Sequence, residues 1–169
     1  MKILVIQLAR LGDTFLMWPA LRALRRKEPN AHIEVLTRLK YVEALEGLTE
    51  IDKVKILPTK DLVEPLFDPQ IDIKTSYGRT DEFIQQLREE KYDWILNFTF
   101  SPTSSYITHA ISHPETKVCG YTRHADGFLA IPDDMSAYFY AQVGIHRANR
   151  YHLCEIFSTM ASVDLIPED

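Results

Sequence analysis

The stretch Lys2-Ile-Leu-Val-Ile-Gln-Leu-Ala-Arg-Leu-Gly-Asp13 indicates the fold class of this 169-residue chain. Residues 3–8 form a nearly continuous run of apolar, largely β-branched side chains, which is typical of a strand buried on both faces of a parallel sheet. A polar loop follows, and then Met17, Leu21 and Leu24 recur at helical spacing. This order of strand, loop and helix predicts the first unit of an α/β domain.

The same alternation continues along the chain. Further strands are expected over residues 33–37, 54–57, 92–99 and 117–121, and further helices over 40–47, 79–90, 104–112 and 149–162. Residues 58–76 are predicted to be mostly loop, and 122–148 show no clear pattern. Repeated strand–helix units indicate a three-layer, Rossmann-like α/β domain with a mostly parallel sheet. Ligands of such sheets bind beyond the carboxyl ends of the strands, so the loop at 9–14 is the first candidate site.

Composition narrows the class of partner and the compartment. The chain has 19 basic and 24 acidic residues, a net charge of −5, and therefore gains little from counterion release on nucleic acid. A local basic patch can still hold an anionic small molecule. No secretory signal and no membrane-spanning apolar run is evident, so we expect a cytoplasmic protein with at most peripheral membrane contact. Cys119 and Cys154 are expected to be free, buried thiols.

Three common uses of the first loop of an α/β sheet are disfavoured. A dinucleotide-binding turn needs three glycines, and this loop contains only Gly12. A phosphate-binding P-loop ends in Gly-Lys-Ser/Thr, which is absent here. A phosphate-accepting receiver domain would carry acidic residues just after the first strand, where this chain has Gln7-Leu-Ala-Arg10.

The loop residues Arg10, Gly12 and Asp13 can serve structure or chemistry. Gly12 is expected to permit a tight strand-to-helix turn. Asp13 falls where a helix N-cap would be, and it is either a cap or a catalytic carboxylate. The helix either begins near Pro19 or has a first turn at Asp13 that is kinked at Pro19. Arg10 is either a surface cation or a bidentate clamp for a phosphate or carboxylate.

The opening KILVIQLARLGDTFLMWPALRALRRKEPNAHIEVLT resembles the start of lipopolysaccharide heptosyltransferases, which belong to glycosyltransferase family 9. The features that carry the resemblance are an apolar strand followed by Leu11-Gly12-Asp13, Pro19, Leu21-Arg22-Ala23-Leu24-Arg25 and Pro29. The segments KYDWILNFTFSPTSSYITHAI, KVCGYTR and NRYHLCEIFSTMASVD are similar to later parts of the family more loosely.

The resemblance implies the N-terminal, acceptor-binding half of a GT-B fold, in which two Rossmann-like domains face each other across a cleft. Residues 1–162 would form this domain and 163–169 the start of the interdomain linker. The C-terminal domain, which would hold an ADP-sugar donor, is then missing, so no cofactor or metal site is expected in this chain. Asp13 would be the general base of an inverting heptosyl transfer to a lipopolysaccharide core acceptor such as lipid A–Kdo. The fragment alone is expected to be inactive.

Further acceptor contacts are expected from the first loop and from two other sheet-edge segments. The residues in this set are Arg10, Gly12, Thr14, Ser104, Ser105 and Arg123. The two serines equally fit a helix-capping role, and Arg123 an exposed structural one. Two rival functions stay open, namely a non-catalytic sugar- or nucleotide-binding module, and a related transferase that uses another donor or a protein acceptor.

Several other residues have a structural and a functional interpretation. His109 and His113 would share a helix face and could bind zinc, although no third ligand is evident. A basic cluster near the last helix fits a solvated helix start or contact with an anionic acceptor or lipid headgroups; it comprises His146, Arg147, Arg150 and His152. Trp94 is expected in the core, and Trp18 can line the acceptor cleft.

Overall fold

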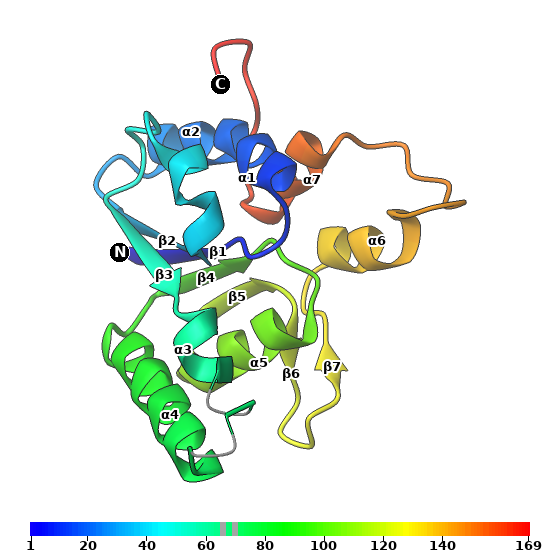
Figure 1. The fold of residues 1–169 in the computed structure, drawn as a ribbon. Coiled ribbons are helices and arrows are strands. Elements are labelled where there is room, and N and C mark those ends of the chain that lie inside the picture. The colour runs from blue at the N-terminus through cyan, green and yellow to red at the C-terminus, as the bar shows by residue number, and fades with distance from the viewer. Residues whose placement is uncertain (65–66, 69–70) are drawn as a thin grey trace.

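The computed structural model describes residues 1–64, 67–68 and 71–169, and its centre is one parallel sheet (Figure 1). The five strands are ordered β3-β2-β1-β4-β5. They are β1 (Lys2–Ile6), β2 (His32–Arg38), β3 (Lys53–Leu57), β4 (Trp94–Asn97) and β5 (Lys117–Gly120). The order reverses at β1, whose neighbours are β2 and β4, so a ligand site is expected at the carboxyl ends of these central strands.

Helices cover both faces of the sheet, which confirms the three-layer, Rossmann-like architecture (Figure 1). One face carries α1 (Leu11–Leu16), α2 (Trp18–Lys27) and α7 (Leu153–Met160). The other carries α3 (Thr59–Val63), α4 (Ile73–Glu89) and α5 (Pro102–Ile111). The 3₁₀ helix η1 (Leu39–Leu45) follows β2, while the hairpin of β6 (Thr122–Arg123) and β7 (Leu129–Ala130) and helix α6 (Asp134–Gln142) follow β5.

The first strand separates two hydrophobic cores. Ile3 and Val5 belong to the core formed with α2 and α7, whereas Leu4, Ile6 and Leu8 belong to the core on the side of α4 and α5. All five side chains are buried. Because alternate side chains of a strand point to opposite faces, a strand covered on both faces has apolar residues at every position. This two-sided burial explains the continuous apolar run at residues 3–8.

The prediction that residues 58–76 are mostly loop is wrong in part. Helix α3 occupies Thr59–Val63, and α4 begins at Ile73, earlier than the expected 79. Ile73 and Tyr77 are exposed, and α3 packs on the core through half-buried Leu62, so these turns have too little apolar periodicity to be recognised. Residues 65–66 and 69–70 of the expected loop lie outside the described part of the chain.

The segment after β5 is ordered by hydrogen bonds rather than by an apolar pattern. The carboxylate of Asp133 accepts from the backbone N–H of Gly120 at 2.7 Å and of Ser136 at 2.8 Å, so it caps α6 and ties that helix to the sheet. Gly120 has φ 103°, and a Cβ there would lie 2.2 Å from the carbonyl oxygen of Asn97. A glycine is therefore required where β5 ends beside β4.

Residues 163–169, predicted to begin a linker, lie against α2. Val163 is buried in the core, Arg22 donates to the backbone oxygen of Asp169 at 2.8 Å, and Arg26 donates to that of Asp164 at 2.6 Å. The domain boundary stays a prediction. Cys119 is buried and Cys154 half-buried, and both are free thiols. No helix in the described residues is long and apolar enough to cross a bilayer.

Candidate active site

A cavity of about 530 Å³ opens at the carboxyl ends of β1 and β4. Arg10 and Asp13 line it from the β1 side, Phe100 and Ser101 line it from the β4 side, and Arg38 lines it from the end of β2. Its further lining residues are apolar or small, namely Leu8, Ala9, Phe98, Thr99, Phe139, Val143, Leu153 and Phe157. The cavity lies at the edge of the sheet that the strand–helix pattern indicated.

Asp13 is not the helix N-cap, which corrects the sequence prediction. Helix α1 begins at Leu11 and Arg10 occupies the N-cap position. An arginine side chain has no hydrogen-bond acceptor and cannot cap the first turn. Instead, Oδ2 of Asp13 reaches back and accepts from the backbone N–H of Arg10 at 3.3 Å. The half-buried Asp13 carboxylate thus has one long structural contact and still lines the cavity.

The sequence offered two alternatives, a helix that begins near Pro19 or a first turn at Asp13 that is kinked at Pro19, and the structure contains elements of both. Helix α1 ends at Leu16, and α2 begins at Trp18 with Pro19 in its first turn. The role predicted for Gly12 is wrong, because its φ is not positive and a Cβ there would have no neighbour within 4 Å. The turn from β1 into α1 therefore does not require a glycine.

The cavity carries one carboxylate and two guanidinium groups. Arg10 is exposed, and Arg38 is half-buried; its buried Nε has no hydrogen-bond partner among residues 1–64, 67–68 and 71–169. In the described part of the chain, neither arginine nor Asp13 forms an ion pair. Sequence reasoning missed Arg38, although it immediately follows the expected strand at 33–37. The rule that drew attention to residues 9–14 applies equally to that position.

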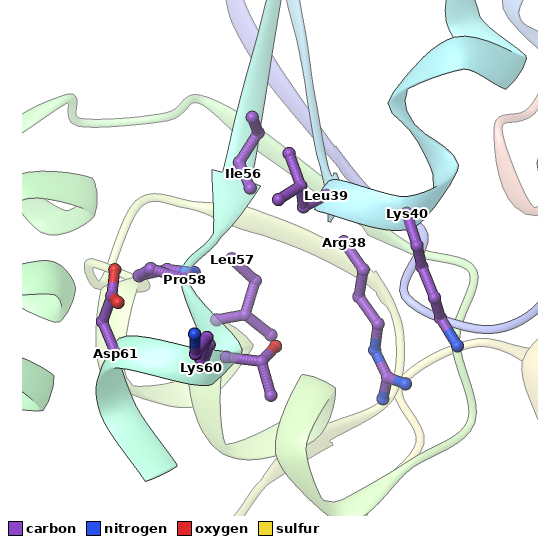
Figure 2. A pocket seen from close by; sticks show the side chains of 9 residues that line it. Arg38, Leu39, Lys40, Ile56, Leu57, Pro58, Lys60 and Asp61 are labelled. Atoms are coloured by element: carbon purple, nitrogen blue, oxygen red, sulfur yellow. The ribbon is translucent and has the colours of Figure 1, made fainter. Parts of the chain in front are cut away.

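Arg38 also lines a second cavity, of about 720 Å³, at the carboxyl ends of β2 and β3 (Figure 2). Its walls are largely apolar, with Leu39, Ile56, Leu57 and Pro58 beside the polar residues Lys40, Thr59, Lys60 and Asp61. Figure 2 shows the side chains of Arg38 and Lys40 extending in the same direction from the end of β2 and the start of η1. This cavity is the larger, but the first one contains the carboxylate and is the better candidate for chemistry.

Several solved structures that match this arrangement of elements are glycosyltransferases. E. coli heptosyltransferase WaaC with ADP-2-deoxy-2-fluoro heptose matches 96% of the chain at 14% identity and a TM-score of 0.62. A family 9 glycosyl transferase from Veillonella parvula matches 95% of the chain at 20% identity and a TM-score of 0.65. E. coli ADP-heptose lps heptosyltransferase II matches 95% of the chain at 17% identity and a TM-score of 0.57. This chain has a heptosyltransferase-like fold.

The heptosyltransferase-like domain spans less than half of these structures, 47% of WaaC and 40% of each of the other two. No protein-family model and no curated protein sequence matches it. At 14–20% identity, the structural likeness establishes the fold. The chemistry must therefore be argued from the side chains that line the two cavities.

Three hydroxyl residues predicted to bind acceptor are fully buried in this heptosyltransferase-like domain. Thr14 donates to the backbone oxygen of Arg10 at 3.2 Å. Ser104 donates to that of Thr99 at 2.6 Å, and Ser105 to that of Pro102 at 2.8 Å. None of the three lines either cavity. The cap of α5 is Ser101, whose Oγ accepts from the N–H of Ser104 at 3.1 Å, so the predicted helix start at 104 is wrong.

Arg123 serves the β6–β7 hairpin. Its Nε donates to Oγ of Ser105 at 2.9 Å, and its Nη1 donates to the backbone oxygen of Gly127 at 3.1 Å. The guanidinium carbon lies 4.3 Å from the ring centre of Tyr106. Arg123 lines neither of the two cavities. Of the predicted acceptor contacts, the fold brings only Arg10 into the same cavity as Asp13.

Three of the remaining candidates, His113, His152 and Trp18, have structural partners. Helix α5 ends at Ile111, so His113 does not share its face with His109, and its Nε2 lies 3.0 Å from the backbone oxygen of Arg88. His152 caps α7, which fits the solvated helix start predicted there. Trp18 donates to the backbone oxygen of Ala44 at 3.0 Å and does not line the cavity. The described residues contain no group of three or more His, Cys, Asp or Glu side chains that could hold a metal.

Proposed function

We propose that this chain is the acceptor-binding half of an inverting glycosyltransferase that moves a heptose-type sugar from an ADP-sugar to a lipopolysaccharide core acceptor. The observation that carries the proposal is the carboxylate of Asp13, which forms no ion pair with any described residue and lies in a cavity at the strand-order reversal of a heptosyltransferase-like fold. The donor would be held by a second domain outside these 169 residues. By itself the chain would bind acceptor and would not catalyse transfer.

In the proposed reaction Asp13 is the general base. Its carboxylate takes the proton of an acceptor hydroxyl while that oxygen forms a bond to the anomeric carbon of the donor. The bond from this carbon to the diphosphate oxygen breaks, and its electron pair leaves with ADP. Attack opposite the leaving group inverts the configuration. A carboxylate within hydrogen-bond reach of the hydroxyl supplies a rate factor of about 10²–10⁴.

The two unpaired arginines support an anionic acceptor. Guanidinium groups bind carboxylate and phosphate bidentately, and Arg10 and Arg38 share the cavity with Asp13. Lipid A–Kdo carries both kinds of anion, and the second cavity beside Arg38 offers space for part of an extended acceptor. The solved structure of WaaC with ADP-2-deoxy-2-fluoro heptose supports an ADP-sugar as donor. We place the reaction at the cytoplasmic face of the inner membrane, with peripheral contact only.

The test is a transfer assay on the product of the complete gene that encodes this chain, with ADP-heptose and lipid A–Kdo. Asp13→Asn and Asp13→Ala are compared with Asp81→Asn, which removes an exposed carboxylate on α4 outside both cavities. We expect kcat to fall by about 10²–10⁴ in both Asp13 variants and to be unchanged in the control.

The other outcomes separate the rival functions. Full transfer by the Asp13 variants would leave a transferase whose base lies elsewhere. If the wild-type protein transfers no sugar from ADP-heptose but does so from another nucleotide sugar or to a protein acceptor, the donor or acceptor assignment is wrong. If it transfers nothing and only binds sugar or nucleotide, the chain is a binding module.

A further inference from the structure

The cavity around Asp13 has a charged wall and an aromatic wall. Four phenylalanines line it, and they differ in how much surface they leave free. Phe98 and Phe157 are buried and stack on each other with ring centres 4.7 Å apart, and Phe139 is half-buried. Phe100 is 49% exposed. It is thus the ring of this wall with the most surface available to a ligand.

Phe100 is held in place by the short connection from β4 to α5. On its N-terminal side, Thr99 donates through its backbone N–H to Asn97 at 3.1 Å and through its hydroxyl to Gln7 at 3.0 Å. On its C-terminal side, Ser101 caps α5. The ring itself packs in edge contacts with Tyr121 and Tyr140, each with ring centres 4.7 Å apart.

A ring fixed in this way loses little conformational freedom on binding. Fixing a ligand-contacting group before the ligand arrives reduces the entropic cost of association. An exposed aromatic surface also gains free energy when a ligand removes it from water. Phe100 therefore favours a ligand that presents an apolar face toward it.

The two walls together fit a sugar ring. A pyranose carries hydroxyl groups around its edge and C–H bonds on its faces, so it needs hydrogen-bonding groups beside it and a flat apolar surface against one face. A purely apolar ligand would leave Asp13, Arg10 and Arg38 without partners, and a free phosphate would not use the ring. The volume of about 530 Å³ lies within the range of small-molecule sites, about 300–1,000 Å³.

We propose that Phe100 is a stacking platform for a pyranose ring of the acceptor, which orients a hydroxyl group of that ring toward Asp13. This inference rests on the proposed function, because it assigns the sugar to the acceptor of the transfer. Phe100 would act as a binding and specificity residue. It would favour acceptor sugars that have an unobstructed C–H face over sugars whose faces carry axial hydroxyl groups.

The test is saturation-transfer NMR on this chain with methyl β-D-glucopyranoside as the probe. We expect the ring C–H protons on one face of the probe to receive the strongest saturation. Phe100→Ala and Phe100→Leu should weaken binding by about 2- to 10-fold, the range that corresponds to one aromatic contact. Phe100→Tyr should retain it, because the ring is kept. Phe128→Ala, which removes a 73% exposed ring that does not line the cavity, is the matched control.

Three outcomes would overturn the platform. The first is that the wild-type chain transfers no saturation to the probe. The second is that Phe100→Leu binds the probe as tightly as the wild type does. The third is that Phe128→Ala weakens binding of the probe as much as Phe100→Ala does. Thermal unfolding of each variant establishes that the fold is intact, and Phe100→Leu and Phe100→Tyr keep the test decisive if Phe100→Ala unfolds.

The transfer assay distinguishes failure of the platform from failure of the proposed function. Sugar binding through Phe100 without any transfer by the complete protein would refute the function and leave Phe100 as a sugar-binding platform that has no acceptor role. Normal transfer with an acceptor KM that is unchanged by Phe100→Leu would leave the function and refute the platform.

Discussion

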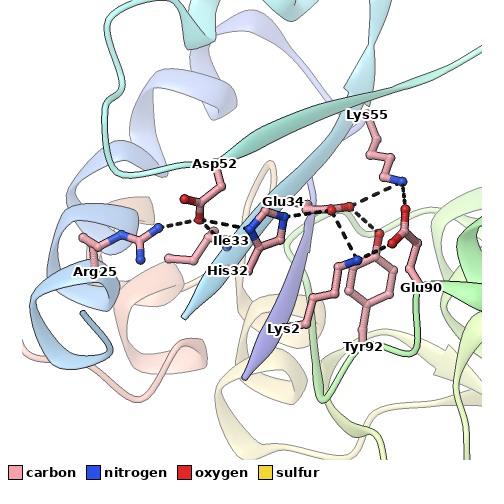
Figure 3. Close-up of polar contacts among 9 residues, drawn as sticks. All are labelled: Lys2, Arg25, His32, Ile33, Glu34, Asp52, Lys55, Glu90 and Tyr92. Atoms are coloured by element: carbon pink, nitrogen blue, oxygen red, sulfur yellow. Dashed lines mark hydrogen bonds and ion pairs between the residues drawn. The ribbon is translucent and has the colours of Figure 1, made fainter. Parts of the chain in front are cut away.

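The two ends of the central sheet differ in whether their charged side chains form ion pairs. At the carboxyl end, Arg10, Asp13 and Arg38 line one cavity, and none of them forms an ion pair among the described residues. At the amino end, charged side chains from several elements are joined in a network that includes Glu34 and Glu90 (Figure 3).

The centre of the amino-end network is Glu34, whose side chain is only 1% exposed. Its carboxylate accepts from the hydroxyl of Tyr92 at 2.6 Å and lies 3.5 Å from the ammonium nitrogens of both Lys2 and Lys55. Both lysines also pair with Glu90. Burial alone would raise the pKa of Glu34, but the hydrogen bond from Tyr92 and the two positive charges outweigh it and lower the pKa.

The difference follows from access to water. A carboxylate as deeply buried as Glu34 must be paired and hydrogen-bonded, because an uncompensated buried charge costs several kcal/mol. The exposed Arg10 and half-buried Asp13 can remain unpaired because water solvates them. The paired charges serve stability, and the unpaired charges are free to bind a ligand.

The largest expected effect on stability is that of Glu34→Ala. Removing Glu34 leaves the buried Tyr92 hydroxyl and two lysines without their central partner, so we expect a loss of about 3–5 kcal/mol in the free energy of unfolding. Asp13→Ala removes one contact of 3.3 Å and should cost less than about 1 kcal/mol. Urea denaturation measures both.

A matched surface variant completes this experiment. Glu64→Ala removes a carboxylate from an exposed pair with Lys60 at 4.0 Å, and such pairs contribute about 0–1 kcal/mol. If Glu34→Ala is no more destabilising than Glu64→Ala, the network does not have the structural role assigned to it here.

A smaller effect, on binding rather than stability, is expected from Arg38→Ala. Within the described part of the chain, Arg38 makes no ion pair and its buried Nε has no hydrogen-bond partner, so its removal should change stability by less than about 0.5 kcal/mol. The loss of a charged hydrogen bond to an acceptor anion should raise the acceptor KM by about 10-fold or more.

Arg25→Ala is the matched variant at the amino end, where the arginine that is removed is paired. Arg25 pairs with Asp52 at 2.6 Å and donates to the backbone oxygen of Glu50 at 3.0 Å. We therefore expect Arg25→Ala to lower stability and leave the acceptor KM unchanged. Similar effects of both arginine variants on KM would contradict the division between the two ends of the sheet.

A further expected effect is the pH dependence of the network. Hydrogen bonds from Lys2 and Lys55 lower the pKa of Glu90 from 4.5 to about 2. A carboxylate with a lowered pKa in the folded state stabilises the fold above its unfolded pKa and loses this contribution as pH falls. Stability should therefore decline between pH 4.5 and about pH 2, as measured by urea midpoints.

Glu90→Gln is the variant that isolates this contribution. The amide does not titrate, so the decline of the urea midpoint below pH 4.5 should be shallower in the variant than in the wild type. Parallel curves for the two proteins would assign the acid sensitivity to other carboxylates, such as Asp52, whose pKa is also lowered because the hydrogen bonds from Ile33 and Arg25 outweigh its burial.

Part of the site could be predicted from local sequence. The apolar run at 3–8 predicted the central strand, and the rule for strand ends then led to Arg10 and Asp13, which line the cavity. The Ser104 helix start was wrong although a signal existed. Proline is favoured at the first helical position, so Pro102 marks Ser101 as the N-cap, as the structure has it.

Other parts of the site could not be read from the sequence. Phe100 follows an expected strand, but the sequence does not indicate that its ring is exposed while Phe98 is buried. The exposure depends on how α6 and the chain after β5 pack, and the segment 122–148 has no apolar pattern that predicts this packing. The same limit applies to Thr14, which is buried within α1 and does not line the cavity.

The sequence by itself determined the chain order of the five strands of the central sheet, the two-sided burial of β1 and the edge of the sheet where function is expected; α3, α6 and the β6–β7 hairpin were not predicted. These features depend on side-chain periodicity within a few consecutive residues, which the sequence displays directly. Only the tertiary structure decided which charges are paired. Glu34 meets Lys2, Lys55 and Tyr92 from three other segments, whereas Asp13 meets no cation of the described residues within ion-pair distance. Pairing depends on distances between segments that are remote along the chain, and these distances exist only once the sheet has formed.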